Sequence, residues 1–153
     1  MIKKVIPFCL FVFLIIQTCT IKASAQQGPT VDHIALYVYD FEKSTAFYRD
    51  VMQFKLISEP FKDGKHSWFT VGPNSRLHII KGATDVKEHD INSHFAYHVK
   101  VLKNFTDHLD KMNIQYHNWN GDSKEPTLRP DGVKQVYFQD PDKYWIEVND
   151  DKS

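Results

Sequence analysis

The chain has 153 residues, of which 19 are basic and 19 acidic, and 42% of its residues are hydrophobic. This length suits one compact domain with a core of its own. The charges are balanced and form no long run of one sign, which excludes nucleic acid as a partner and favours small molecules.

The first 25 residues have the pattern of a secretory signal peptide. Lys3 and Lys4 give a basic start, residues 5–16 are apolar, and residues 23–25 form the small-residue triplet Ala-Ser-Ala. We expect cleavage after Ala25 and an exported chain, periplasmic or secreted, with no membrane attachment after cleavage.

A membrane anchor and a lipid anchor on Cys19 are the alternatives for this segment. Gln17 and Thr18 end the apolar run, which is shorter than the ~20 residues of a spanning helix. Thr18 is also larger than the residue expected before a lipidated cysteine.

The remaining chain, residues 26–153, is expected to be a single domain. Both cysteines, Cys9 and Cys19, lie in the signal segment, so disulfides and thiolate chemistry are excluded from the mature chain. Three lysines also lie there, which leaves the mature chain with a net charge of −3.

The first half of the mature chain predicts a βαβββ module at about residues 29–83. Residues 31–38 alternate as a half-buried strand does, and Asp40 precedes a helical pattern with Phe47, Tyr48 and Val51 on one face. Strand-like segments follow at 55–58, 67–71 and 76–81.

The same order returns 61 residues later, in a second module at about residues 90–150. A strand at 93–99 precedes a helix from about Asn104, and strands are expected at 115–119, 134–139 and 144–149. Five positions fall in register at this offset, which indicates an internal duplication: His33 with His94, Ala35 with Ala96, Val38 with Val99, Tyr48 with Leu109 and Val51 with Met112.

The second module has eight extra residues, because His78 lies 45 residues after His33 whereas Glu147 lies 53 residues after His94. Segment 120–132 is rich in turn-forming residues and is expected to hold them in one loop. The loop either covers a site or is a surface insertion.

Four polar residues share one face of the expected sheet: His33, His78, His94 and Glu147. Strand side chains alternate between faces, so the apolar neighbours of each residue place it opposite the face that packs on helices. Imidazole and carboxylate groups are costly to bury singly, and a divalent cation would satisfy their lone pairs. A lone histidine on a strand is more often a packing or surface residue, but four repeat-related positions predict a metal site.

Nitrogen and oxygen ligands without sulfur fit zinc, nickel, cobalt, manganese or iron(II). Three weaker candidates for substrate binding lie on the same strand faces. Arg76 would bind an anion and Trp145 an apolar group, while His98 would line the pocket or support a ligand. Packing or solvent exposure is the competing interpretation for all three.

Residues 31–149 resemble the vicinal oxygen chelate superfamily, which includes glyoxalase I, extradiol dioxygenases and bleomycin-binding proteins. Residues 137–147, with Asp140-Pro141-Asp142, are similar to the closing motif of glyoxalase I, where glycine usually stands at the position of Lys143. Residues 33–56 are similar to the family's opening motif.

The resemblance implies an α+β fold of two tandem βαβββ modules, which form a cup-shaped mixed β-sheet with helices on the outside. It implies one divalent metal ion, with Zn²⁺ or Ni²⁺ favoured over Co²⁺, Mn²⁺ or Fe²⁺, held by His33, His78, His94 and Glu147. It also implies a homodimer with modules shared between chains. Glyoxalase I usually has a glutamate at His78, so Glu147 is left as the expected proton-transfer base.

The expected function is that of an exported, metal-dependent lyase or isomerase of the glyoxalase I (lactoylglutathione lyase) type. Its substrate would be a small oxygen-rich molecule, and the resemblance implies a metal-chelated enediolate-type intermediate. Two alternatives stay open: an iron(II) extradiol-type dioxygenase with His33, His94 and Glu147 as ligands, and a non-catalytic small-molecule binding or resistance protein.

Overall fold

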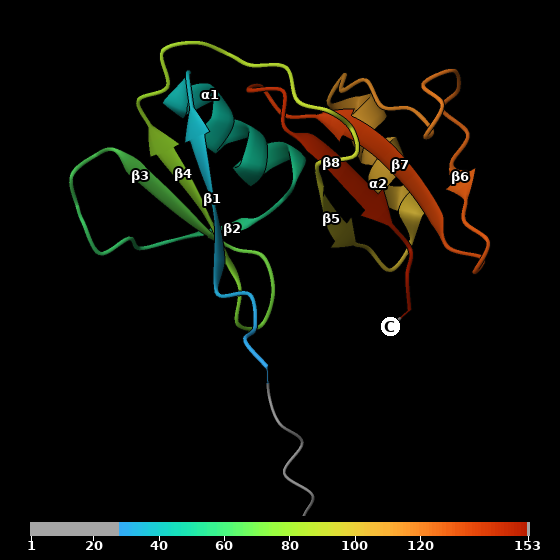
Figure 1. Ribbon diagram of the computed structural model, residues 1–153, viewed down its shortest axis with the longest axis horizontal. Helices are drawn as coiled ribbons and strands as arrows, with labels where there is room; N and C mark the ends of the chain where they lie inside the picture. The colour runs from blue at the N-terminus through green and yellow to red at the C-terminus, as the bar shows by residue number, and fades with distance from the viewer. Residues whose placement is uncertain (1–27, 153) are drawn as a thin grey trace, which may run out of the picture.

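The structure, a computed structural model, describes residues 28–152 (Figure 1), so the expected signal peptide lies outside the described residues. The first module comprises β1 (His33–Val38), α1 (Phe41–Ala46), a π-helical turn η1 (Phe47–Val51), β2 (Lys55–Ile57), β3 (His66–Thr70) and β4 (Arg76–Lys81). The second comprises β5 (His94–His98), α2 (Leu102–Lys111), β6 (Thr127–Leu128), β7 (Lys134–Gln139) and β8 (Trp145–Asn149). Between residues 28 and 152, no helix is long and apolar enough to cross a membrane.

Each module contributes one four-stranded mixed sheet, in the orders β1-β4-β3-β2 and β5-β8-β7-β6. The first and last strands of each module run parallel, and the other neighbours run antiparallel. The predicted α+β fold of two βαβββ modules is therefore confirmed.

The strand register shows that repeat-related residues occupy equivalent positions in the two sheets. Ala35 lies opposite His78 in the first sheet, and Ala96 lies opposite Glu147 in the second. His78 and Glu147 therefore occupy equivalent places, although the second module has eight more residues before Glu147 than the first has before His78.

One expectation about the second module is wrong. The strand expected at 115–119 is reduced to an isolated bridge between His117 and Tyr137, and the short β6 takes the edge position from within the expected loop 120–132. The helix expected from about Asn104 is present and begins at Leu102, and Met112 is its exposed C-cap. The apolar pattern therefore identified these segments but not their bounds.

The apolar faces of both sheets share one core with the helical segments, which lie beside and between them (Figure 1). Side chains at alternate strand positions point the other way. The faces that carry the four candidate ligands are thus turned away from the shared core, one on each sheet. The core residues include Leu36, Val38, Phe69, Leu77 and Ile79 from the first sheet, Val136, Phe138, Ile146 and Val148 from the second, and Phe47, Tyr48, Val51, Leu102 and Leu109 from the helical segments.

Two buried carboxylates in the β7–β8 turn join the modules. Asp140 accepts a hydrogen bond of 2.6 Å from the hydroxyl of Tyr48, and Asp142 accepts one of 2.6 Å from the hydroxyl of Ser44. The backbone N–H of Tyr39 also donates to Asp142, at 2.6 Å. Burial raises the pKa of Asp140 to about 6, against the hydrogen bond from Tyr48, which lowers it.

The fourth residue of the same turn, Lys143, has a backbone conformation that glycine adopts more easily. Lys143 has a φ of 69°, in the left-handed region, and its N–H donates to the carbonyl of Asp140 at 3.1 Å. A side chain with a Cβ is strained there by about 1–2 kcal/mol, whereas glycine is not.

Candidate metal centre

The first half-site consists of His33 and His78, whose rings stack at a centroid distance of 4.3 Å. The ring of His78 also stacks on the ring of Trp68 on β3, at a centroid distance of 3.7 Å, because the two residues are cross-strand partners. His33 is exposed, whereas His78 is only 7% exposed. Three parallel rings therefore stand in a row across the sheet.

Both imidazoles have a nitrogen available to a metal ion. Nδ1 of His33 lies 2.7 Å from a carboxylate oxygen of Asp32, which can only accept, so a neutral His33 keeps its lone pair on Nε2. Nε2 of His78 is buried and has no hydrogen-bond partner within residues 28–152. Burial, followed by the nearby His33, lowers the pKa of His78 and favours its neutral form.

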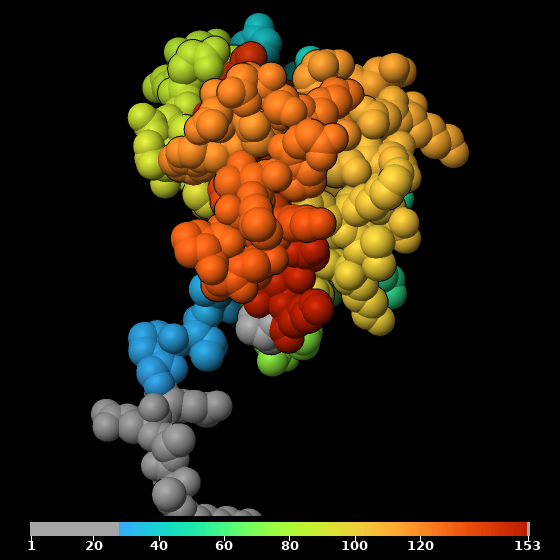
Figure 2. All heavy atoms as spheres, turned by 90° about the vertical axis from the view of Figure 1, so that its right-hand side faces the viewer, coloured from blue at the N-terminus to red at the C-terminus, as the bar shows by residue number. Residues whose placement is uncertain are grey.

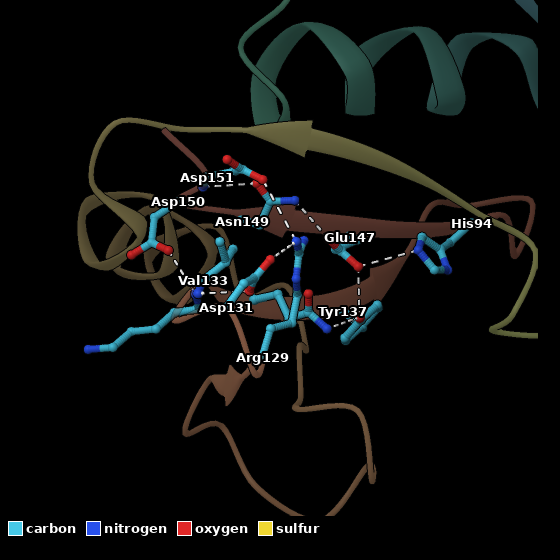
Figure 3. A network of polar contacts seen from close by, with 11 residues as sticks. His94, Arg129, Asp131, Val133, Tyr137, Glu147, Asn149, Asp150 and Asp151 are labelled. Atoms are coloured by element: carbon cyan, nitrogen blue, oxygen red, sulfur yellow. Dashed lines mark hydrogen bonds and ion pairs between the residues drawn. The ribbon is translucent and has the colours of Figure 1, made fainter. Parts of the chain in front are cut away.

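The second half-site consists of His94 and Glu147, whose Nε2 and Oε2 atoms lie 3.3 Å apart (Figure 3). Nδ1 of His94 lies 2.7 Å from the carbonyl oxygen of Ile91 and must donate to it. A neutral His94 therefore turns a lone pair toward a carboxylate oxygen. Such a pair needs either a shared proton or a shared cation between the two atoms.

The donor set fits a divalent ion in two respects. Two ligands at about 2.1 Å from a tetrahedral metal are about 3.4 Å apart, close to the distance between His94 and Glu147. In both His33 and His94, the second ring nitrogen is held by an oxygen acceptor, which is the usual arrangement behind a metal-bound histidine.

The four predicted ligands form two pairs within one chain. His33 with His78, and His94 with Glu147, lie on separate sheets (Figure 1). Among residues 28–152, no group of three or more histidine, cysteine, aspartate or glutamate side chains lies close enough to hold a metal ion. A single chain therefore brings together each half of the predicted set but not the whole.

The weaker candidates have different surroundings. Arg76 lies beside the first half-site, where its Nη1 is 3.4 Å from Asp32, and it lines a hollow of about 310 Å³ with His33, His78 and Trp68. Trp145 donates from its indole N–H to the carbonyl of His89 at 2.8 Å, which ties it to the segment between the modules. His98 is exposed, on the strand face of His94. Of the three, Arg76 is the one beside a hollow.

Sequence reasoning missed three polar residues around Glu147: Gln135, Tyr137 and Asn149. All lie on its face of the second sheet, and all are less than 9% exposed. Burial, followed by the hydrogen bond to Glu147, raises the pKa of Tyr137, so its hydroxyl stays protonated and donates. The alternation of polar and apolar residues along 134–139 was the signal that could have identified Gln135 and Tyr137.

The loop beside this half-site covers much of the outer surface of the second module (Figure 2, orange). Trp119, at its start, is 40% exposed, and its ring packs edge-on to Tyr137 at a centroid distance of 5.4 Å. The ring of Tyr137 in turn packs edge-on to His94. The loop therefore places an accessible aromatic side chain next to the residue that contacts His94.

Comparisons with known proteins agree with this fold. None of the curated proteins compared with the sequence matches it. Among solved structures, lactoylglutathione lyase from Agrobacterium tumefaciens is 19% identical, with a TM-score of 0.60 over 80% of this chain and 94% of that one. The antibiotic-binding protein TnmS3 from Streptomyces is 18% identical, with a TM-score of 0.63 over 82% and 98%.

The fosfomycin resistance protein FosX from Mesorhizobium loti is 16% identical, with a TM-score of 0.61 over 82% of this chain and 95% of that one. At such identities these likenesses establish the fold and leave the activity open. The family model for the Glyoxalase/Bleomycin resistance protein/Dioxygenase superfamily matches residues 30–148, most of the sequence. The chain therefore belongs to this superfamily.

Proposed function

We propose that this protein is an exported, metal-dependent lyase or isomerase of the glyoxalase I type that acts on a small oxygen-rich substrate. The observation that carries the proposal is the pairing of His94 and Glu147 at 3.3 Å, beside buried donors that fix the carboxylate. Members that only sequester a ligand have less need of such a pair. A matching half-site at His33 and His78 supports the same conclusion.

Each complete centre is formed by two copies of the chain. The half-sites lie on sheet faces turned away from the shared core, so they cannot meet within one chain without disrupting that core. A symmetric dimer pairs the first half-site of each copy with the second half-site of the other, and this produces two equivalent centres.

His33 and His78 of one copy, with His94 and Glu147 of the other, would hold the metal ion. Three imidazoles and one carboxylate suit Zn²⁺ or Ni²⁺, while Co²⁺, Mn²⁺ and Fe²⁺ also accept such ligands. When bound, the ion supplies electrostatic stabilisation of negative charge that develops on neighbouring substrate oxygens.

Glu147 is the residue that moves the proton between adjacent carbons of the substrate. It is the only carboxylate in the proposed ligand set, and a carboxylate retains a basic lone pair that a metal-bound imidazole lacks. Arg76, beside the first half-site, would bind an anionic group of the substrate.

The variant Glu147→Gln tests this role, because it retains an oxygen donor and removes the base. We expect the chemical step to slow by roughly 10² to 10⁴-fold while metal content measured by elemental analysis stays near one ion per chain. The assay would follow methylglyoxal with several thiols. If activity falls only in proportion to lost metal, and excess metal restores it, Glu147 is a ligand and not the base.

Two other outcomes would replace the proposed chemistry. Ring cleavage of a catechol that depends on iron(II) and oxygen would identify a dioxygenase. Tight ligand binding without turnover under any metal would identify a binding or resistance protein.

Export is part of the proposal and rests on the pattern of residues 1–25. Sequencing the amino terminus of the mature protein should give Gln26 as the first residue. A cytoplasmic chain that retains Met1 would contradict it.

A further inference from the structure

The carboxylate of Glu147 has a hydrogen-bond donor on each oxygen (Figure 3). The hydroxyl of Tyr137 donates to Oε2 at 2.7 Å, and the side-chain amide of Asn149 donates to Oε1 at 2.7 Å. Tyr137 is the cross-strand partner of Glu147, and Asn149 lies two residues further along the same strand. Both donors therefore belong to the rigid part of the sheet.

Further contacts fix the direction of these two hydrogen bonds. The side-chain N–H of Gln135 donates to the hydroxyl oxygen of Tyr137, which directs the hydroxyl proton toward Glu147. The side-chain carbonyl of Asn149 accepts from the N–H of Asp151 at 3.2 Å, which turns its amide N–H toward Glu147. The carboxylate is thereby oriented before any cation arrives.

The equivalent places in the first sheet show that this arrangement is not a property of the fold alone. There, His78 has Trp68 as its cross-strand partner and Ile80 two residues along. Neither donates a hydrogen bond to it, and His78 is held by ring stacking instead. The module whose ligand is a carboxylate therefore supplies hydrogen-bond donors. The module whose ligand is an imidazole supplies an aromatic ring that stacks on it.

We propose that Tyr137, supported by Gln135, and Asn149 are positioning residues that hold the Glu147 carboxylate toward His94 so that the second half-site is formed before the metal binds. This inference rests on the proposed function, because it assigns a role to residues behind a ligand of the proposed centre. Preorganisation of this kind lowers the cost of ordering a ligand when the ion binds.

The test compares the Co²⁺ affinity of the wild-type mature chain with that of Tyr137→Phe, by competition with a chromophoric chelator. We expect Tyr137→Phe to bind Co²⁺ about 10 to 100-fold more weakly, the usual effect of losing a residue that supports a ligand. The visible absorption of bound Co²⁺ should also change, because the carboxylate is no longer held in one orientation. Asn149→Ser should weaken Co²⁺ binding in the same direction.

The matched control is Tyr48→Phe, which also removes a buried tyrosine hydroxyl bonded to a carboxylate, that of Asp140, but at the junction between modules. Both variants should have a lower Tm, and only Tyr137→Phe should lose Co²⁺ affinity. Equal affinity in Tyr137→Phe and the wild type would overturn the inference and leave the proposed function standing. A wild-type chain that binds no divalent ion would overturn both.

Discussion

Mixing two inactive variants should restore activity if each metal centre is formed by two chains. His33→Ala damages the first half-site of a chain, and His94→Ala damages the second. In a dimer that contains one of each, one centre receives both damaged half-sites and the other receives two intact ones. We expect this outcome because the two pairs lie on separate sheets that share one core.

The size of the recovery follows from random pairing of chains. Equal amounts of the two variants give about one half mixed dimers, and one of the two centres in each is intact. Activity and tightly bound metal should therefore reach about a quarter of the wild-type values. Each variant alone should stay near the background of the assay.

The assay needs chain exchange, which partial unfolding in urea followed by dilution would allow. A mixture of His33→Ala with His78→Ala is the matched control. Both substitutions damage the first half-site, so no pairing gives an intact centre, and activity should stay at background. Equal activity in the two mixtures would refute the shared centre, as would full activity of a protein shown to be monomeric at the assay concentration.

Three further outcomes follow from local features of the fold. Lys143→Gly should raise the free energy of unfolding by about 0.5–1 kcal/mol, measured by urea denaturation, because it relieves a left-handed backbone; no change would mean that the strain is absorbed elsewhere. His78→Glu should lower the Tm and should not by itself improve metal binding, because it replaces a stacked imidazole by a buried charged group; a tighter metal site in this variant would count against that reasoning. Asp140 has a pKa of about 6 in the folded chain, above its ordinary value of 3.8, so its neutral form is favoured by folding. Stability from this group should be greatest below about pH 4 and should fall by roughly 3 kcal/mol as the pH rises through about 6, and Asp140→Asn should flatten this slope in unfolding curves taken across that range.

The fold could be predicted from the sequence because the duplication is visible in the residue pattern of each module. The alternation of polar and apolar residues gives the inward face of each strand. In the structure His33 lies beside His78, and His94 lies beside Glu147. It could not say how the two sheets face one another, because that depends on packing between segments far apart in the chain. Within residues 28–152 of one chain the four residues do not come together, and we propose that a second copy completes the set.

Sequence reasoning also did not identify the residues that hold Glu147 through hydrogen bonds. Tyr137 was treated only as part of a family motif, although its place opposite Glu147 allows its hydroxyl to donate to the carboxylate. The strand expected at 115–119 is absent because this segment pairs at a single bridge and then continues into the loop. Pairing partners, which decide such cases, are not visible in local periodicity.

The shared core gives the two half-sites of one chain a fixed spacing. Asp140 and Asp142 join the β7–β8 turn to the first module through buried hydrogen bonds, so we expect the two sheets to move together. In the proposed dimer, each chain contributes one half-site to each of the two centres, and its shared core connects them. A ligand that shifts one sheet at the first centre must also shift the half-site presented at the second, so we expect occupancy of the two centres to be thermodynamically linked.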